Sequence, residues 1–325
     1  ASRLTVEAPI VKDKGSFILS GRRTYADLFL GLANNEDLRS SRLFFYDLNL
    51  KANYAVTSKD RVFLSGYFGR DVFRNGGFGV DWGNATGTVR WNHLHNSRLF
   101  SNVTLYYSNF NYALGTDEQT QAFSWKSNIR DLGAKLDLNY YFNPSNTLSF
   151  GYQLIRHQFN PGVVKSKGDG SVVTGLELER AHALEHAAYV SNEQRIGTRF
   201  TATYGLRVSM FQNVGSKTIY TYDEDHQVND TLHYGRGEVY NTSFNLEPRV
   251  GLRYGLNELS AVKASYNRTA QYLHLASNGL SSSPFDVWFP SSPNVKPQLA
   301  DQVALGYFRN IHGDRWELSV ETYYK

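Results

Sequence analysis

Two pairs of histidines have spacings that are compatible with metal binding. His93 and His95 are two residues apart, so their side chains would lie on the same face of a β-strand. Imidazole is a common zinc ligand, but no third protein ligand is evident beside this pair. His182 and His186 have the spacing of ligands on a helix, although the residues around them predict a strand. We therefore expect no metal site, and we place His182 and His186 on a polar inner sheet face or at a loop edge.

Two further segments could bind ions by their composition. Residues 222–230 contain several carboxylates, which are the ligands that calcium prefers, but they lack the spaced Asp/Asn-Gly pattern of a dedicated calcium loop. Residues 75–79 are rich in glycine, but the Lys-Ser/Thr of a phosphate-binding loop does not follow them. A solvated acidic loop and a flexible surface loop are the favoured interpretations.

A third segment, residues 281–297, is apolar and stiffened by prolines. Phe285, Trp288 and Phe289 could together form an aromatic surface for an incoming solute or for a partner lipoprotein. We name these three as candidate substrate-binding residues. The alternative is that the loop folds against the rim of the protein and buries them.

No catalytic constellation stands out, and we expect no enzyme activity and no cofactor. The sequence has no cysteine and no Gly-x-Ser-x-Gly nucleophile motif. Its 34 basic and 30 acidic residues give a net charge of +4, and the two signs alternate along the chain. Nucleic-acid binding is not expected, because it usually needs basic residues clustered on one element.

The elements that would position these residues are β-strands. Apolar or aromatic residues alternate with polar ones in long stretches, which is the period of a strand with two different faces. In residues 201–210, for example, Leu206 belongs to the apolar set and Arg207 to the polar set. The alternation recurs in residues 135–142, 147–154, 250–254, 262–266, 303–307 and 316–320.

Short and long connections alternate between these strands. Short turns are predicted near residues 12–15, 57–60, 95–97, 143–146, 194–197, 256–258 and 312–314. Long loops are predicted near residues 25–41, 71–83, 113–124, 161–177, 213–240 and 272–298, the first with a short helix within residues 25–37. Seven turns and six loops connect fourteen strands.

Long strands with polar inner positions favour a transmembrane antiparallel β-barrel over a soluble sandwich. A sandwich needs an apolar inner face on each sheet, whereas a lumen accepts charges. Mean hydropathy is −0.45, as the alternation would produce, and no run of about 18 apolar residues occurs. Leu206 is then expected to face lipid. We therefore expect Leu206→Arg to destabilise the barrel far more than Arg207→Leu does.

The ends of the strands support a membrane setting. Tyr54, Tyr140 and Trp316 lie beside short turns, where aromatic side chains would meet the lipid headgroups. If short turns face the periplasm, Asn143 and Ser145 lie there, whereas Asp225 and Asp286 face the exterior.

The direction of the strands predicts that residues 1–325 are one part of a larger barrel domain. The first strand would run into a short turn and the last out of one, which places both chain ends on the long-loop side. Complete bacterial barrels have even strand numbers and normally place their ends on the periplasmic side. We therefore expect closing strands outside this chain.

Two segments resemble a known family. Residues 8–18, APIVKDKGSFI, with SGRRTY at residues 20–25, resemble the early barrel hairpin of TonB-dependent outer-membrane receptors of the Bacteroidetes type. Residues 282–290, SSPFDVWFP, and residues 292–307, SPNVKPQLADQVALGY, resemble a loop and strand of the same receptors. The Pro-Lys-Pro of those receptors has only its second proline here, in Val295-Lys296-Pro297.

The resemblance implies a barrel of about 22 strands in the bacterial outer membrane, of which about fourteen are present. It also implies a plug domain and a TonB system that acts through it, neither of which this sequence contains. The expected function is TonB-dependent import of a nutrient or cofactor, with this chain as barrel wall and external loops. Outer-membrane lipid and a surface lipoprotein are the other expected partners. A passive outer-membrane channel and a structural subunit of an outer-membrane complex remain as alternatives.

Overall fold

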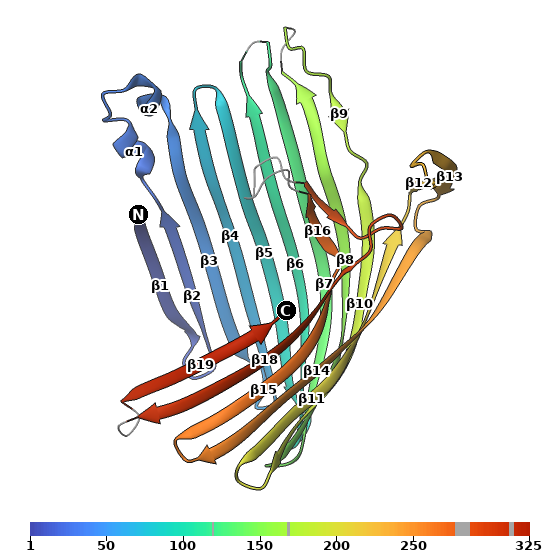
Figure 1. Ribbon diagram of the computed structural model, residues 1–325. Helices are drawn as coiled ribbons and strands as arrows, with labels where there is room; N and C mark the ends of the chain where they lie inside the picture. The colour runs from blue at the N-terminus through green and yellow to red at the C-terminus, as the bar shows by residue number, and fades with distance from the viewer. Residues whose placement is uncertain (119, 168–169, 277–286, 312–314) are drawn as a thin grey trace.

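A single curved antiparallel sheet dominates the computed structural model, which describes residues 1–118, 120–167, 170–276, 287–311 and 315–325 (Figure 1). Strands that are neighbours in the sheet follow one another along the chain, apart from short insertions. The predicted number of about fourteen wall strands is confirmed within the described residues. In sheet order they are β1 (Ser2–Val11), β2 (Gly15–Arg23), β3 (Arg42–Ala55), β4 (Asp60–Asn75), β5 (Phe78–Leu94), β6 (Leu99–Thr116), β7 (Phe123–Asn143), β8 (Asn146–Ser166), β10 (Ala181–Ile196), β11 (Phe200–Val214), β14 (Val239–Asn257), β15 (Ser260–Gln271), β18 (Gln298–Ile311) and β19 (Trp316–Tyr324).

The two faces of the sheet differ as the alternation predicts. Leu206 pairs with Val190 and Pro248, and all three side chains point outward. Leu206 and Val190 are among the many apolar residues that are exposed. Arg207 pairs with Tyr189 and Glu247 on the concave, inward face. Because side chains alternate along every strand, the register that places Leu206 outward places Arg207 inward.

Short and long connections lie at opposite ends of the strands (Figure 1). The short turns after β1, β3, β5, β7, β10 and β14 agree with the sequence prediction, and residues 312–314 and Asp286 lie outside the described residues. Tyr54, Tyr140 and Trp316 all lie at the short-turn end.

Several strands continue into segments that the sequence predicted as loops. The prediction of a long loop at residues 71–83 is wrong, because β4 and β5 enclose only Gly76 and Gly77, whose φ angles are +55° and +86°. Glycine suits this turn because it adopts positive φ without steric cost. Likewise β6 continues to Thr116 and β7 begins at Phe123, so both extend into the predicted loop 113–124. β8 continues to Ser166, inside the predicted loop 161–177.

Short elements decorate the long-loop end. The expected helix is divided into α1 (Ala26–Leu30) and α2 (Glu36–Ser40). β9 (Leu176–Glu177) pairs with β8, and β12 (Lys217–Tyr222) with β13 (Val228–Tyr234) forms a hairpin inside the predicted loop 213–240. A second hairpin pairs β16 (Leu273–Ala276) with β17 (Val287–Pro290). Neither described helix is long and apolar enough to cross a membrane.

Candidate functional site

The hairpin β16–β17 folds back onto the inward face of the wall near β8 and β10 (Figure 1). Its strands pair Leu273 with Pro290 and Leu275 with Trp288. The hairpin therefore places part of the apolar loop beside the lumen.

An aromatic stack holds the start of this hairpin against the wall. The ring of Tyr272 lies parallel to that of Phe211 in β11, with centroids 4.8 Å apart and an interplanar angle of 5°. Both belong to a buried cluster with Phe159, Ala181 and Ala183. This cluster lies between loop and barrel, so burying it favours the folded-back position of the hairpin.

A chain of hydrogen bonds joins the same tyrosine to the wall. The Ser209 hydroxyl donates to Glu247 over 2.7 Å, so the Tyr272 hydroxyl is the donor in its own 2.7 Å contact with Ser209 Oγ. Asn245 Nδ2 donates to Tyr272 Oη over 2.8 Å. The phenol is thus fully satisfied although it is buried.

The end of the hairpin is anchored by buried polar groups. Asn213 of β11 donates from Nδ2 to the backbone carbonyl of Ser291 over 2.7 Å and accepts from Asn241 over 2.8 Å. The hydroxyl of Ser291 lies 2.8 Å from Nε2 of His274. Burial lowers the pKa of His274, which keeps this ring neutral at pH 7. Both ends of the hairpin are therefore fixed to the wall.

A cavity of about 390 Å³ lies between the hairpin β16–β17, the hairpin β12–β13 and the wall. Lys217 and Glu179 stand at its polar side, with their charged atoms 2.8 Å apart. Asn294 donates to the carbonyl of Tyr220 over 3.3 Å. The aromatic side chains that line it are Phe159, Tyr220, Tyr240, Trp288 and Phe289. Flat apolar faces beside a few polar groups are the usual composition of a small-molecule site.

Trp288 and Phe289, two of the three candidate residues, lie together in this cavity wall. Both are half-buried, so the loop packs against the wall and still leaves part of each ring accessible. Phe285 lies outside the described residues. Tyr220, Tyr240 and Lys217 were missed because they come from a segment predicted as an undivided loop.

The inward wall below the hairpin carries paired charges. Arg207 lies 3.5 Å from a carboxylate oxygen of Glu185 and of Glu247, and His157 Nε2 lies 3.5 Å from Glu185. Glu247 is 4% exposed. A buried carboxylate is tolerated because it is paired and hydrogen-bonded. The inward face is therefore polar where a sandwich would need an apolar core.

Comparison with known proteins assigns this architecture to a protein family. The family model of the TonB-dependent receptor-like β-barrel matches residues 18–325. The chain belongs to this family. TonB-dependent receptor barrels lie in the outer membrane of Gram-negative bacteria, so the exposed apolar face of this receptor barrel is its lipid-facing surface, as predicted.

Solved structures of receptors share the fold at low sequence identity. The closed form of the ferric-catecholate import receptor Fiu from E. coli K12 is 13% identical, with a TM-score of 0.65, over 99% of this chain and 55% of that one. BauA, the ferric preacinetobactin receptor of Acinetobacter baumannii, is 12% identical, with a TM-score of 0.67, over 99% of this chain and 51% of BauA. The Serratia marcescens hemophore receptor HasR, in complex with its hemophore HasA and heme, is 11% identical, with a TM-score of 0.64, over 99% of this chain and 53% of HasR. The chain spans about half the length of these structures. No curated protein matches the sequence.

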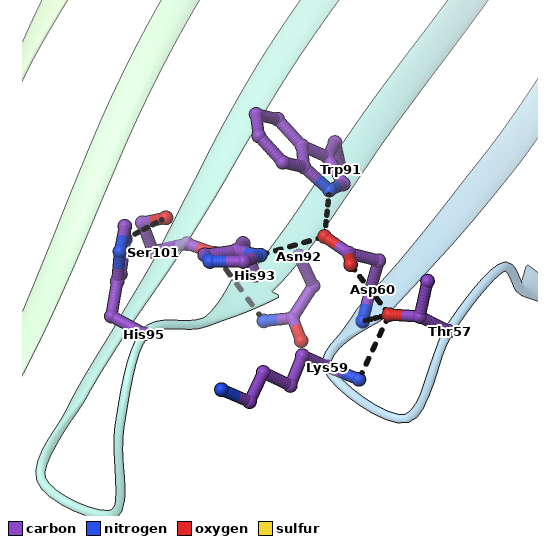
Figure 2. Close-up of polar contacts among 8 residues, drawn as sticks. All are labelled: Thr57, Lys59, Asp60, Trp91, Asn92, His93, His95 and Ser101. Atoms are coloured by element: carbon purple, nitrogen blue, oxygen red, sulfur yellow. Dashed lines mark hydrogen bonds and ion pairs between the residues drawn. The ribbon is translucent and has the colours of Figure 1, made fainter.

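The histidine pair of the receptor barrel forms a polar cluster at the short-turn end (Figure 2). The Asp60 carboxylate accepts from the Trp91 indole N–H over 3.0 Å, and His93 Nδ1 lies 2.6 Å from it. His95 Nε2 instead contacts Ser101 Oγ over 3.0 Å. Each ring thus has its own partner, and Trp91 and His93 face outward beside the turn, where aromatic residues contact headgroups.

The other ion-binding candidates of the receptor barrel also have structural roles. Asp223 Oδ1 accepts the backbone N–H groups of Asp225 and Gln227, which shapes the turn of β12–β13. His186 lies on the outward face, 2.6 Å from the Tyr152 hydroxyl, and His182 shares that face. The expected inner face is wrong for both, but His182, the second residue of β10, does lie at a loop edge, which was the alternative expectation. Within the described ranges, no three His, Asp or Glu side chains are arranged to hold a metal ion.

Proposed function

We propose that this chain is the barrel wall of a TonB-dependent importer, which takes up a nutrient or cofactor across the outer membrane. Membership of the receptor-barrel family over residues 18–325 carries the proposal. The cavity that the luminal hairpin forms also supports it, because aromatic rings beside a few polar groups suit the binding of a specific solute. In the proposed mechanism a plug domain fills the lumen, and TonB moves it after substrate has bound.

We further propose that substrate binds in the cavity between the two hairpins, against Trp288 and Phe289. The accessible parts of these rings offer apolar contact, while Lys217 and Asn294 offer polar groups that would orient a solute. Phe285, in the same loop, remains a candidate contact. A surface lipoprotein that delivers substrate to this face is a further proposed partner.

The sequence segments at residues 8–25 and 282–307 favour a receptor of the Bacteroidetes type, and we propose this subgroup on that resemblance alone. The substrates named for Fiu, BauA and HasR are iron compounds or heme. We therefore propose a metal chelate, heme or another nutrient too scarce for passive uptake.

A growth experiment tests import. The gene of the whole receptor is deleted in its host, and the cells are grown on single limiting sources of iron, heme, cobalamin and carbon. We expect a growth defect on one source, the same defect after loss of TonB, and rescue by the intact gene. The double variant Trp288→Ala/Phe289→Ala should fail to rescue, whereas the lipid-facing control Tyr204→Ala should succeed.

The alternatives give different results in the same strains. A passive channel would support uptake without TonB and would conduct ions in a planar bilayer. A structural subunit would show no nutrient-specific defect, and its loss would release stable protein partners from the membrane. Either pattern would contradict import.

A further inference from the structure

The connection between β2 and β3 carries large apolar side chains that remain exposed in the described part of the chain. Leu28, Phe29 and Leu32 are 63%, 75% and 80% exposed. Leu32 follows α1 but continues its turn, because its N–H donates to the carbonyl of Phe29 over 3.1 Å. Residues three and four apart lie on one side of a helix, so these three side chains form one apolar surface. We call this surface the helix patch.

The start of this connection is fixed to the outward face of the wall. The guanidinium of Arg23 lies 5.0 Å from the ring centroid of Phe44 in β3, and its Nη2 atom lies 3.0 Å from the carboxylate of Asp27 in α1. Phe44 shares its face of β3 with Tyr54, which lies in the same row of paired residues as the outward-facing Trp91. α1 therefore begins on the outward face.

The end of the connection lies on the same face. α2 packs beside β4, and Ser40, its last residue, lines a recess together with Arg70 and Asp81. Arg70 pairs with Tyr46, which lies two residues from Phe44 on the outward face of β3. Both helices thus lie at the long-loop end, on the side of the wall that faces lipid and away from the lumen (Figure 1).

The depth of α1 in the membrane follows from the length of β3. On the outward face of this strand Tyr54 lies beside the short turn, and Phe44 lies ten residues before it, with Leu48 and Leu50 between them. The apolar band of a membrane barrel is about 25 Å tall, which corresponds to roughly ten tilted residues. Tyr54 and Phe44 therefore mark the two boundaries of the hydrocarbon. Because Arg23 ties α1 to Phe44, the helix patch continues the lipid-facing surface at its long-loop edge.

We propose that the helix patch is a membrane anchor, with Leu28, Phe29 and Leu32 inserted among the acyl chains of the outer leaflet just below the headgroups. Burial of these side chains removes apolar surface from water, which is how a helix lying in the membrane interface gains its binding energy. A helix as short as α1 is not stable alone. The barrel already holds it at the correct depth, so the patch does not have to supply the whole cost of association.

Lipid is the occupant that the geometry selects. The helix patch is continuous with the lipid-facing surface, and both ends of its connection lie on that side of the wall. The connection between β2 and β3 therefore does not contribute to the substrate-binding surface. This anchor depends only on the outer-membrane position of the barrel and is separate from substrate import.

Fluorescence quenching in phosphatidylcholine vesicles tests the proposal. A nitrobenzoxadiazole fluorophore is attached to a cysteine at Ala33, beside the patch, in a whole receptor without other cysteines. Nitroxides on the acyl chains close to the headgroups should quench it at least about twofold more than the same fluorophore at Asp225, since an interfacial helix lies about 5–10 Å into this boundary. Iodide in the water should quench the two fluorophores in the opposite order.

A matched pair of variants tests the side chains themselves. Leu28→Ser/Leu32→Ser removes two apolar groups of the patch and should reduce the nitroxide quenching at Ala33 to about half or less. Val228→Ser/Leu232→Ser changes two exposed apolar residues of β13 and should leave that quenching unchanged. All four side chains are exposed, so neither variant removes a packing contact of the wall.

Three results would overturn the proposal. Equal nitroxide quenching at Ala33 and Asp225 would place the connection in water. A fluorophore at Ala33 that neither the nitroxides nor iodide reach would show that another protein segment covers the patch. Unchanged quenching in Leu28→Ser/Leu32→Ser would show that other contacts hold the connection in place.

Discussion

Leu206 and Arg207 are neighbours in β11 with opposite surroundings. Leu206 is 40% exposed on the lipid face, so Leu206→Arg should cost about 2–4 kcal/mol of unfolding free energy near the bilayer midplane. The exposed inward residue Thr203 provides a control, since Thr203→Leu should cost much less. Unfolding of the receptor in lipid bilayers measures both, and the reverse order would show that the two faces are exchanged.

The contacts of Arg207 change the expectation that its replacement costs little. Removing the guanidinium would leave Glu185 and the buried Glu247 without their shared cation. Glu247 would keep Arg249 at 3.7 Å, and Glu185 would keep His157 at 3.5 Å. Arg207→Leu should therefore cost less than about 3–5 kcal/mol, the cost of an uncompensated buried charge, but more than a change at an exposed lumen residue. Adding Glu247→Gln should recover part of the loss, and no recovery in the same unfolding assay would argue against this pairing.

His274 predicts a pH dependence for the docked hairpin. Burial places its pKa in the folded hairpin below the unfolded value of 6.5, so protonation opposes docking. The docked state should be fully stable above that value and lose stability as pH falls through the lower, folded pKa. The emission of Trp288, taken as the difference from a Trp288→Phe variant, should change on acidification. His274→Gln should remove the change, and a change that persists in this variant would assign it to another group.

At the scale of elements, orientation follows from the two kinds of connection. A cysteine at Asp225, in the exposed turn of β12–β13, should react with an impermeant thiol reagent on intact cells. A cysteine at Ser145, in the turn between β7 and β8, should react only after the outer membrane is opened. Residues 1–325 contain no native cysteine, so within this chain only the introduced residue can be labelled. Stronger labelling at Ser145 on intact cells would invert the topology.

Strands were predictable from sequence only where their two faces meet different solvents. In β11 the lipid and lumen faces differ, so the alternation around Leu206 indicated both the strand and its register. Above the hydrocarbon both faces are wet, and residues 71–75 and 78–83 lose the contrast although they remain paired in β4 and β5. The alternation of apolar and polar residues therefore stops at the edge of the bilayer, while the hydrogen bonds between β4 and β5 continue beyond it.

The candidate site was predictable in part for a related reason. Trp288 and Phe289 were found because aromatic residues between prolines are unusual in a loop. Their partners Asn213 and Tyr272 are ordinary strand and loop residues, and only the folded-back path of the chain brings them together. Contacts between residues that are about sixty or more positions apart leave no periodic trace in the sequence.

At the scale of the whole molecule, β1 and β19 form the two edges of the sheet, and each has one paired neighbour among the described strands. An unpaired edge in hydrocarbon leaves backbone N–H and C=O groups unsatisfied, at a cost of several kcal/mol each. We therefore predict that further strands of the whole receptor pair with both edges, including about six or more beyond β19 if the barrel has about 22 strands. Cysteines at Thr5 and Ser319 of the whole receptor should not form a disulfide under oxidation, whereas a control pair at Ser265 and Ala304, which face each other in β15 and β18, should do so. Efficient crosslinking of Thr5 to Ser319 would mean that β1 and β19 close a fourteen-stranded pore, and it would favour the passive channel over the importer.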